Sequence, residues 1–291
     1  MTAATIDAWE NATVQMADRD GLSISFTVTR NATTDKIEFN LVVEEGGPLT
    51  GTVTWDGSWT ATGADRLVFD GHEPFSTVLT DTVDVGAIAF ASVSDYTING
   101  GKIRFSDRGG YAYLSSDAGE HAIGSRIKVP GDFVLEPASG SKVVLDGEIV
   151  GGGVIKRGRG TAEANCENNL LSAGVTVEEG LYSVAKPEAV GGPVTLKGGT
   201  LEFRAGGILD MPVSLDTPYA ATAAVVKVDA DLVMKAPEAT QGAFIKRGIG
   251  RLTLESDSHV VMSGSDAGPL GSGNFVYSSS LTTFDGEGNY A

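Results

Sequence analysis

The chain has 291 residues, of which 41% are hydrophobic and 7% aromatic, and 39 are glycine. Many glycines with few aromatic residues favour a thin, layered β structure over a thick globular interior. The net charge of −17 argues against a general affinity for nucleic acid or anionic membrane, because both require a basic surface. The single cysteine, Cys166, excludes an internal disulfide.

The first residues lack the basic and apolar segments of a signal peptide. No run approaches the ~20 apolar residues of a membrane span. The last residues, 286–291, close no obvious element. We therefore expect a piece of a longer protein.

Near the N-terminus, residues 22–29 and 36–42 alternate apolar and polar side chains. This alternation predicts two strands with one face in water, and the polar segment 30–35 between them predicts a hairpin turn. We interpret residues 1–48 as a small N-terminal β cap or leading module.

From residue 49 onward, short β-branched runs recur every 8–12 residues, separated by glycine, aspartate, asparagine and proline. Such spacing is typical of a sandwich, a barrel or a β-solenoid. Internal repetition distinguishes them: residues 153–161 recur as 243–251, and Leu67–Gly71 is loosely echoed at 281–286. A solenoid must build the same corner in successive turns, whereas a sandwich has no reason to repeat a motif.

With roughly 22 residues per turn, an offset of 90 residues corresponds to about four turns. The strand spacing of ~4.8 Å then places the two motifs about 20 Å apart on the same edge. This geometry is an expectation that coordinates can contradict.

The two motifs resemble the autotransporter-associated β-strand repeat, which opens with Lys-x-Gly-x-Gly-Thr-Leu-x-Leu and continues through an asparagine-rich turn and a glycine-rich strand. Residues 155–161 match the opening, Asn165, Asn168 and Asn169 fall at the turn, and 174–180 and 196–203 match the strands that follow. The second copy, residues 245–254, matches the opening more closely. The resemblance covers residues 55–291 and is strongest within 150–205 and 240–275.

The resemblance implies an all-β, right-handed parallel β-helix (β-solenoid) over residues 49–291, displayed on a cell surface. The structural motif residues are Lys156, Arg157, Gly158 and Gly160 in the first copy and Lys246, Arg247, Gly248 and Gly250 in the second. We expect the glycines to allow positive φ twice at a sharp corner and the Lys-Arg pairs to point outward. Residues 162–164, Ala-Glu-Ala, depart from the usual Leu-x-Leu and predict a distorted rung.

Metal-binding and acid–base chemistry require convergent side chains. The histidines are scattered, and Asp18–Gly21 is interpreted as a turn because the later ligands of a calcium loop are missing. Neighbours on a strand face opposite sides, so Glu178 and Glu179 do not form a dyad. Asp229 and Asp231 share a predicted strand face and are the remaining candidates for a metal ion or acid–base role, if another acidic turn stacks beside them.

No catalytic constellation is evident, since Cys166 has no histidine nearby in the sequence and no nucleophile elbow or phosphate-binding glycine motif occurs. We expect neither enzymatic activity nor a cofactor. The two Lys-Arg-Gly motifs are interpreted as corners of the repeat, with a basic stripe for an anionic glycan as the alternative.

The sequence therefore predicts a non-catalytic structural or adhesive segment of a bacterial cell-surface or secreted protein. Expected partners are host or environmental glycans or other surface proteins, with no nucleic acid and no membrane insertion by this segment. The alternatives are a carbohydrate-active β-helix, either lyase or glycosidase, and a viral fibre-type β protein. A groove with clustered carboxylates and exposed aromatic rings would favour the enzyme.

Overall fold

The structure is a computed structural model. It describes residues 13–17, 22–31, 36–45, 51–55, 59, 65–106, 111–217, 224–235, 238–241, 244–255, 275–277 and 281–284. Within these residues the chain forms short strands and one 3₁₀ helix, η1 (Pro187–Val190). No helix in this part of the chain is long and apolar enough to cross a membrane.

The N-terminal strands form a separate antiparallel sheet of three strands, β1 (Thr13–Ala17), β2 (Leu22–Asn31) and β3 (Lys36–Glu45). Strands β2 and β3 pair from Leu22 opposite Glu45 to Asn31 opposite Lys36. The predicted hairpin is therefore confirmed. The predicted module boundary at residue 48 lies outside the described residues.

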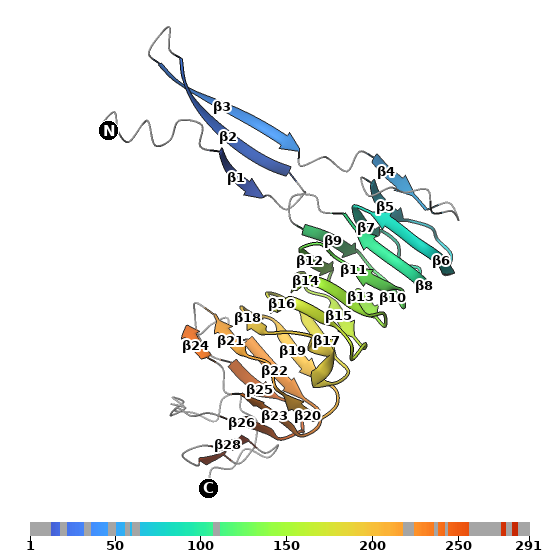
Figure 1. The fold of residues 1–291 in the computed structure, drawn as a ribbon. Coiled ribbons are helices and arrows are strands. Elements are labelled where there is room, and N and C mark those ends of the chain that lie inside the picture. The colour runs from blue at the N-terminus through green and yellow to red at the C-terminus, as the bar shows by residue number, and fades with distance from the viewer. Residues whose placement is uncertain are drawn as a thin grey trace.

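The rest of the fold is a parallel solenoid whose strands stack in three columns, which we call sides 1, 2 and 3 (Figure 1). Side 1 consists of β4 (Gly51–Thr54), β5 (Asp65–Phe69), β7 (Ala87–Phe90), β9 (Tyr111–Ser116), β12 (Asp132–Pro137), the second halves of β14 (Ile149–Lys156) and β16 (Leu170–Val177), β18 (Val194–Leu196), β21 (Val213–Asp216) and β24 (Glu238–Gln241).

Side 2 follows side 1 in each turn. It consists of the first halves of β6 (Phe75–Val85) and β8 (Tyr96–Phe105), then β10 (Glu120–Ile123), β13 (Lys142–Leu145), β15 (Thr161–Ala164), β17 (Leu181–Val184), β19 (Thr200–Phe203), β22 (Ala224–Val228) and β25 (Phe244–Arg247).

Side 3 closes the turn. It begins with the second halves of β6 and β8, β11 (Arg126–Lys128) and the first halves of β14 and β16. Further along the chain it contains β20 (Gly207–Leu209), β23 (Leu232–Lys235) and β26 (Leu252–Glu255).

The strand register shows the length of each turn. Val154 pairs with Val175 in the next turn, and Val175 pairs with Val194 in the turn after that. The spacing between these partners is close to the turn length expected from the sequence. The predicted parallel β-solenoid, with about eight turns, is confirmed.

The core is a set of side-chain columns that run through the solenoid. Val154, Val175 and Val194 stack on side 1, and Ile103, Ile127 and Ile149 stack on side 3, all of them buried. β-branched side chains suit a parallel sheet that is buried on its inner face, which explains how a chain with few aromatic residues forms a continuous interior.

The rung at β15 is regular, and the predicted distortion there is wrong. Ala162 and Ala164 are fully buried, and β15 pairs in register with β13 on one side and β17 on the other. Ala162 lies directly opposite Tyr182, which is also fully buried. The large ring in the next turn fills the volume that a leucine would occupy here, so the small residue does not create a gap.

The first turns of the solenoid are filled by aromatic rings. Trp55 stacks on Phe69 with ring centroids 5.3 Å apart, and Phe69 lies 5.1 Å from Phe90. His121 stacks face to face on Phe90 at 4.1 Å and is fully buried. These rings concentrate in one end of the molecule the large side chains that the later turns lack.

The last described strands depart from the parallel pattern. Strands β27 (Phe275–Tyr277) and β28 (Leu281–Phe284) pair antiparallel with each other, and β28 pairs antiparallel with β26. The sequence echo between 67–71 and 281–286 therefore joins a parallel strand, β5, to an antiparallel one, and it does not mark a repeated rung.

Candidate functional site

The first Lys-Arg-Gly motif lies where β14 ends, at the corner between sides 1 and 2. Lys156 is fully buried, so the prediction that it points outward is wrong. Its place in the register explains this, since Lys156 lies between Leu135 and Val177 in an inward-facing column. The alkyl stem continues the core column, and the ammonium group ends at the corner.

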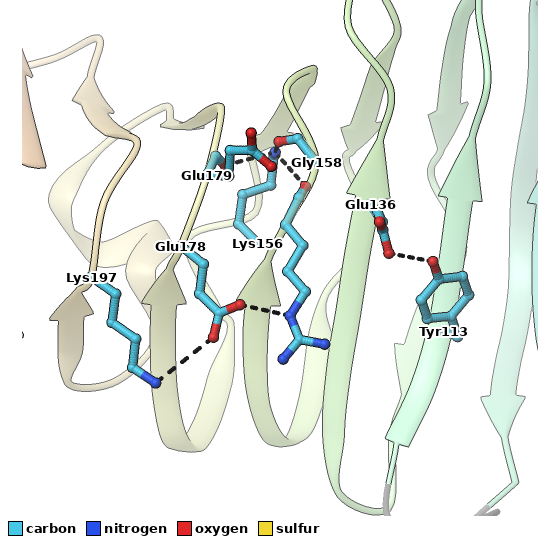
Figure 2. A network of polar contacts seen from close by, with 8 residues as sticks. Tyr113, Glu136, Lys156, Gly158, Glu178, Glu179 and Lys197 are labelled. Carbon is cyan, nitrogen blue, oxygen red and sulfur yellow. Dashed lines mark hydrogen bonds and ion pairs between the residues drawn. The ribbon is translucent and has the colours of Figure 1, made fainter. Parts of the chain in front are cut away.

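The Lys156 ammonium group is bound by the main chain. Its Nζ donates to the carbonyl oxygens of Arg157 and Gly158, each at 2.7 Å, and of Glu179 at 3.1 Å (Figure 2). Burial lowers the pKa of Lys156 to about 8, a shift that the Glu179 and Glu136 carboxylates oppose. The lysine thus joins its own corner to the corner of the next turn.

The second motif repeats this local arrangement. Lys246 is 3% exposed and donates to the carbonyl oxygen of Gly248 at 2.7 Å. It too was expected to point outward, and that expectation is wrong. Arg247, the next residue, is exposed. A buried lysine followed by a glycine corner is therefore a device that this fold uses twice.

The two glycines of each motif act differently. Gly158 and Gly248 have φ of 70° and 85°, which favours glycine, whereas Gly160 and Gly250 are not in this left-handed region. A Cβ atom at Gly160 would lie 2.2 Å from the Ala138 carbonyl oxygen. The expectation of positive φ at both glycines is correct for the first of each pair, and close packing against the neighbouring turn requires the second.

The two motifs lie on different sides of the solenoid, so the prediction that they share one edge is wrong. Lys156 belongs to β14 on side 1 and Lys246 to β25 on side 2. Four register steps carry Lys156 to Ala239, in β24, and Lys246 lies on the following strand of the same turn. Turns of unequal length cause this shift, because the offset between the motifs amounts to four turns and one further side.

Charged side chains form an outward column beside the first motif. The column consists of the residues that directly follow the inward residues of side 1, namely Glu136, Arg157, Glu178, Lys197 and Asp216. Their charges alternate in sign from one turn to the next. Arg157 Nε lies 2.6 Å from Glu178 Oε2, and Lys197 Nζ lies 3.7 Å from Glu178 Oε1 (Figure 2).

Two further contacts extend this charged column. The Tyr113 hydroxyl donates to Glu136, and Arg159 Nε lies 2.9 Å from Glu179 Oε1. The prediction that Glu178 and Glu179 do not form a dyad agrees with these separate partners. Because each charge faces an opposite charge one turn away, the column links turns to each other and is poorly suited to binding an external ion.

The outer face of side 2 also carries ion pairs. Lys142 Nζ lies 3.0 Å from Glu120 and 3.1 Å from Glu163, and Glu202 pairs with Lys227. Burial alone would raise the pKa of Glu202, but the contacts with Lys227 and Ser183 outweigh it and hold that pKa below its usual value. The carboxylates on this face are therefore taken up by bases of neighbouring turns.

The candidate pair Asp229 and Asp231 does not share a strand face. Strand β22 ends at Val228 and β23 begins at Leu232, so both aspartates lie in the corner between them. Asp229 Oδ2 lies 3.4 Å from Lys227 Nζ, and Asp231 Oδ1 accepts the backbone N–H of Arg251 at 2.9 Å. No group of three or more His, Cys, Asp or Glu side chains able to hold a metal ion occurs in the described part of the chain.

The other residues considered for chemistry are also dispersed. Cys166 is a half-buried free thiol. His121 Nε2 contacts the Ala118 carbonyl oxygen at 2.7 Å, Nδ1 accepts the Tyr96 N–H, and burial lowers the pKa of the ring. The Asp18–Gly21 segment lies outside the described residues.

The sequence analysis missed one concentration of charge. Strands β8 and β11 on side 3 carry Lys102, Arg104, Arg126 and Lys128, which we call the basic quartet. The signal was present as the alternating runs Lys-Ile-Arg at 102–104 and Arg-Ile-Lys at 126–128. What the sequence did not supply was the register that places the two runs side by side.

Comparison with known proteins gives one informative similarity. The chain is 31% identical over 223 residues to the protein named Adhesin BmaC autotransporter from Brucella suis biovar 1 (strain 1330). The match covers 69% of this chain and 6% of that protein, so this chain spans a small fraction of the length of its relative. No family model matches the sequence, and no solved structure matches it. In sequence, this chain is thus similar to one short stretch of an autotransporter adhesin.

Proposed function

We propose that the chain is a non-catalytic structural and adhesive segment of a bacterial surface protein, displayed outside the cell in the manner of an autotransporter passenger. The observation that carries the proposal is a parallel solenoid whose core and ion pairs link each turn to the next, in a chain similar to part of an autotransporter adhesin. The two corner motifs further support assignment to the autotransporter-associated β-strand repeat.

The physical argument concerns how such a fold is stabilised and displayed. Each turn contacts its neighbours, so stability accumulates along the axis without a thick core. The outer faces then repeat at the strand spacing of ~4.8 Å and offer long, flat surfaces for weak contacts. Expected partners are glycans or proteins of a host or environmental surface.

The enzyme alternative has less support. A lyase or glycosidase would need carboxylates gathered in a groove beside exposed aromatic rings. Asp229 and Asp231 lie in a corner with their own partners, and the large hydrophobic side chains that are exposed among the described residues include no aromatic ring. These observations favour a binding or spacing role over catalysis.

Adhesion can be tested directly. The full chain is coupled to fluorescent beads, and retention on a layer of cultured epithelial cells under flow is compared with beads carrying an unrelated protein of equal size and negative charge. We expect greater retention with the chain, and competition by free chain. Retention equal to that of the control beads would contradict the adhesive part of the proposal.

A further inference from the structure

The basic quartet lies on the outer surface of side 3, where β8 and β11 pair in parallel. Lys102 lies opposite Arg126, and Arg104 lies opposite Lys128. The isoleucines between them, Ile103 and Ile127, are fully buried. Because side chains alternate along a strand, the four bases therefore point away from the core.

Two members of the basic quartet have carboxylate partners and two do not. Arg104 makes two contacts of 2.5 Å with Asp84, in the turn before, and Arg126 Nε lies 2.8 Å from Glu148, in the turn after. Within the described part of the chain, neither Lys102 nor Lys128 has a side-chain partner. The lysines occupy diagonal corners of the quartet, and Lys128 is exposed while Lys102 is half-buried.

This arrangement costs stability in the isolated chain. Like charges directly opposite each other on neighbouring strands repel, and both cross-strand pairs of the quartet are of this kind. The charged column on side 1 follows the opposite rule, since its charges alternate. In a chain of net charge −17, four adjacent bases form a local exception, and local exceptions to favourable patterning are characteristic of binding sites.

We propose that the basic quartet binds a linear acidic polysaccharide through its sulfate or carboxylate groups. Strands lie ~4.8 Å apart and residues two apart on a strand ~6.6 Å apart, so the two lysines have Cα atoms about 8 Å apart on a flat sheet. A flat surface suits a polymer that lies across the strands. The arginines, held by Asp84 and Glu148, present fixed N–H groups between the lysines.

The acidic surroundings favour a polysaccharide over nucleic acid. Duplex DNA carries one negative charge per ~1.7 Å of its axis, so it would bring many phosphates against the carboxylates beside the quartet. An acidic polysaccharide carries its charges at intervals of a sugar residue, and it can place a few groups on the quartet alone. This choice of ligand rests on the proposed function of the chain in surface adhesion.

The test uses the full chain and fluorescence anisotropy with labelled heparin octasaccharide as the sulfated probe and hyaluronan octasaccharide as the carboxylated one. We expect saturable binding of at least one probe that weakens as salt rises. The double variant Lys102→Gln/Lys128→Gln should bind about tenfold more weakly, and the slope of log affinity against log salt should fall by roughly two, about one for each cation removed.

A matched control removes two exposed lysines elsewhere, in the double variant Lys186→Gln/Lys197→Gln, and changes the net charge equally. It should bind within about twofold of the unaltered chain, because screened charges outside the site act weakly. Far-UV circular dichroism and thermal unfolding establish that both double variants fold. Equal loss in the two double variants, no binding of either probe, or stronger binding of a DNA duplex of the same total charge would each overturn the proposal.

The two proposals fail in different ways. If the chain-coated beads adhere to cells and the quartet variant adheres equally well, adhesion stands and the quartet is not its site. If the quartet binds the probes but the beads do not adhere, the anion site stands and the adhesive function falls.

Discussion

The corner around Lys156 and the basic quartet both concentrate positive charge, yet they use it in opposite ways. At the corner, Lys156 is satisfied by three carbonyl oxygens, and Arg157 and Arg159 face carboxylates of the next turn. In the quartet, like charges lie opposite each other, and two lysines have no partner among the described residues. In a solenoid, the neighbour one turn away therefore decides whether a base stabilises the fold or remains available to a ligand.

The largest effect that we expect tests the close packing of the corner. Gly160→Ala should lower the free energy of unfolding by about 3 kcal/mol, because the new Cβ atom would lie 2.2 Å from the Ala138 carbonyl oxygen. Gly140→Ala, in the turn just before, meets no atom within 4 Å but has φ of 83°, so it should cost about 1 kcal/mol. Urea unfolding measures both, and equal losses would show that packing does not limit the corner.

The next prediction exchanges the two kinds of lysine. Lys156→Met keeps the apolar stem but leaves the corner carbonyls without their donor, so it should cost about 2 kcal/mol and leave polyanion binding unchanged. Lys128→Met should cost less than about 0.5 kcal/mol and weaken that binding. Urea unfolding and the anisotropy assay separate the two, and a Lys156→Met variant as stable as the unaltered chain would contradict the corner role.

A smaller effect is expected from the charged column. Glu178→Gln removes the ionic partner of Arg157 and Lys197 and should cost about 1 kcal/mol at low salt. In ~1 M salt the loss should shrink, because the charges are screened. Asp117→Asn, an exposed change away from the charged column, serves as the control. A loss that is independent of salt would indicate packing as its cause.

The pH dependence tests the outer face of side 2. The pKa of Glu202 is lower in the folded chain than its ordinary value of 4.5, so its contribution to stability is present above that value and is lost as the pH falls through the folded pKa. Between about pH 5 and pH 3 the unaltered chain should lose more stability than Glu202→Gln. Parallel curves for the two proteins, measured by urea unfolding, would contradict this assignment.

The smallest effect on stability is expected at Asp84. Asp84→Asn should change the free energy of unfolding by less than about 0.5 kcal/mol, since the contact with Arg104 is largely exposed. Polyanion affinity should rise by about twofold, because Arg104 gains freedom and a competing carboxylate charge disappears. A decrease in affinity would mean that Asp84 is needed to orient Arg104.

Much of the fold follows from the sequence. The alternation along the segment 22–42 predicted the β2–β3 hairpin, and the recurrence of one corner motif predicted a solenoid with turns of nearly the observed length. The side on which each motif lies could not be predicted, because it depends on the sum of several unequal corner lengths. The last antiparallel strands broke the repeat without any change in composition.

The candidate site was predicted less well. Strand alternation places Val154 and Lys156 on the same face, so the buried position of Lys156 was implied by its neighbour, but a charged side chain suggested the surface. The basic quartet was visible as two alternating runs separated by one turn, the first beginning at Lys102 and the second at Arg126. Its meaning depends on the strand register, which glycine-rich repeats specify weakly in sequence alone.

The unequal turns have a consequence for how such a chain can change over time. Tyr182 pairs with Leu201, and Leu201 pairs with Val226 after a visibly longer stretch of chain, yet both rungs remain in register. The corners therefore absorb additional residues while the rungs keep their alignment. Insertions and deletions at these corners can diversify the exposed surface, or accept a grafted peptide, without altering the stacked interior.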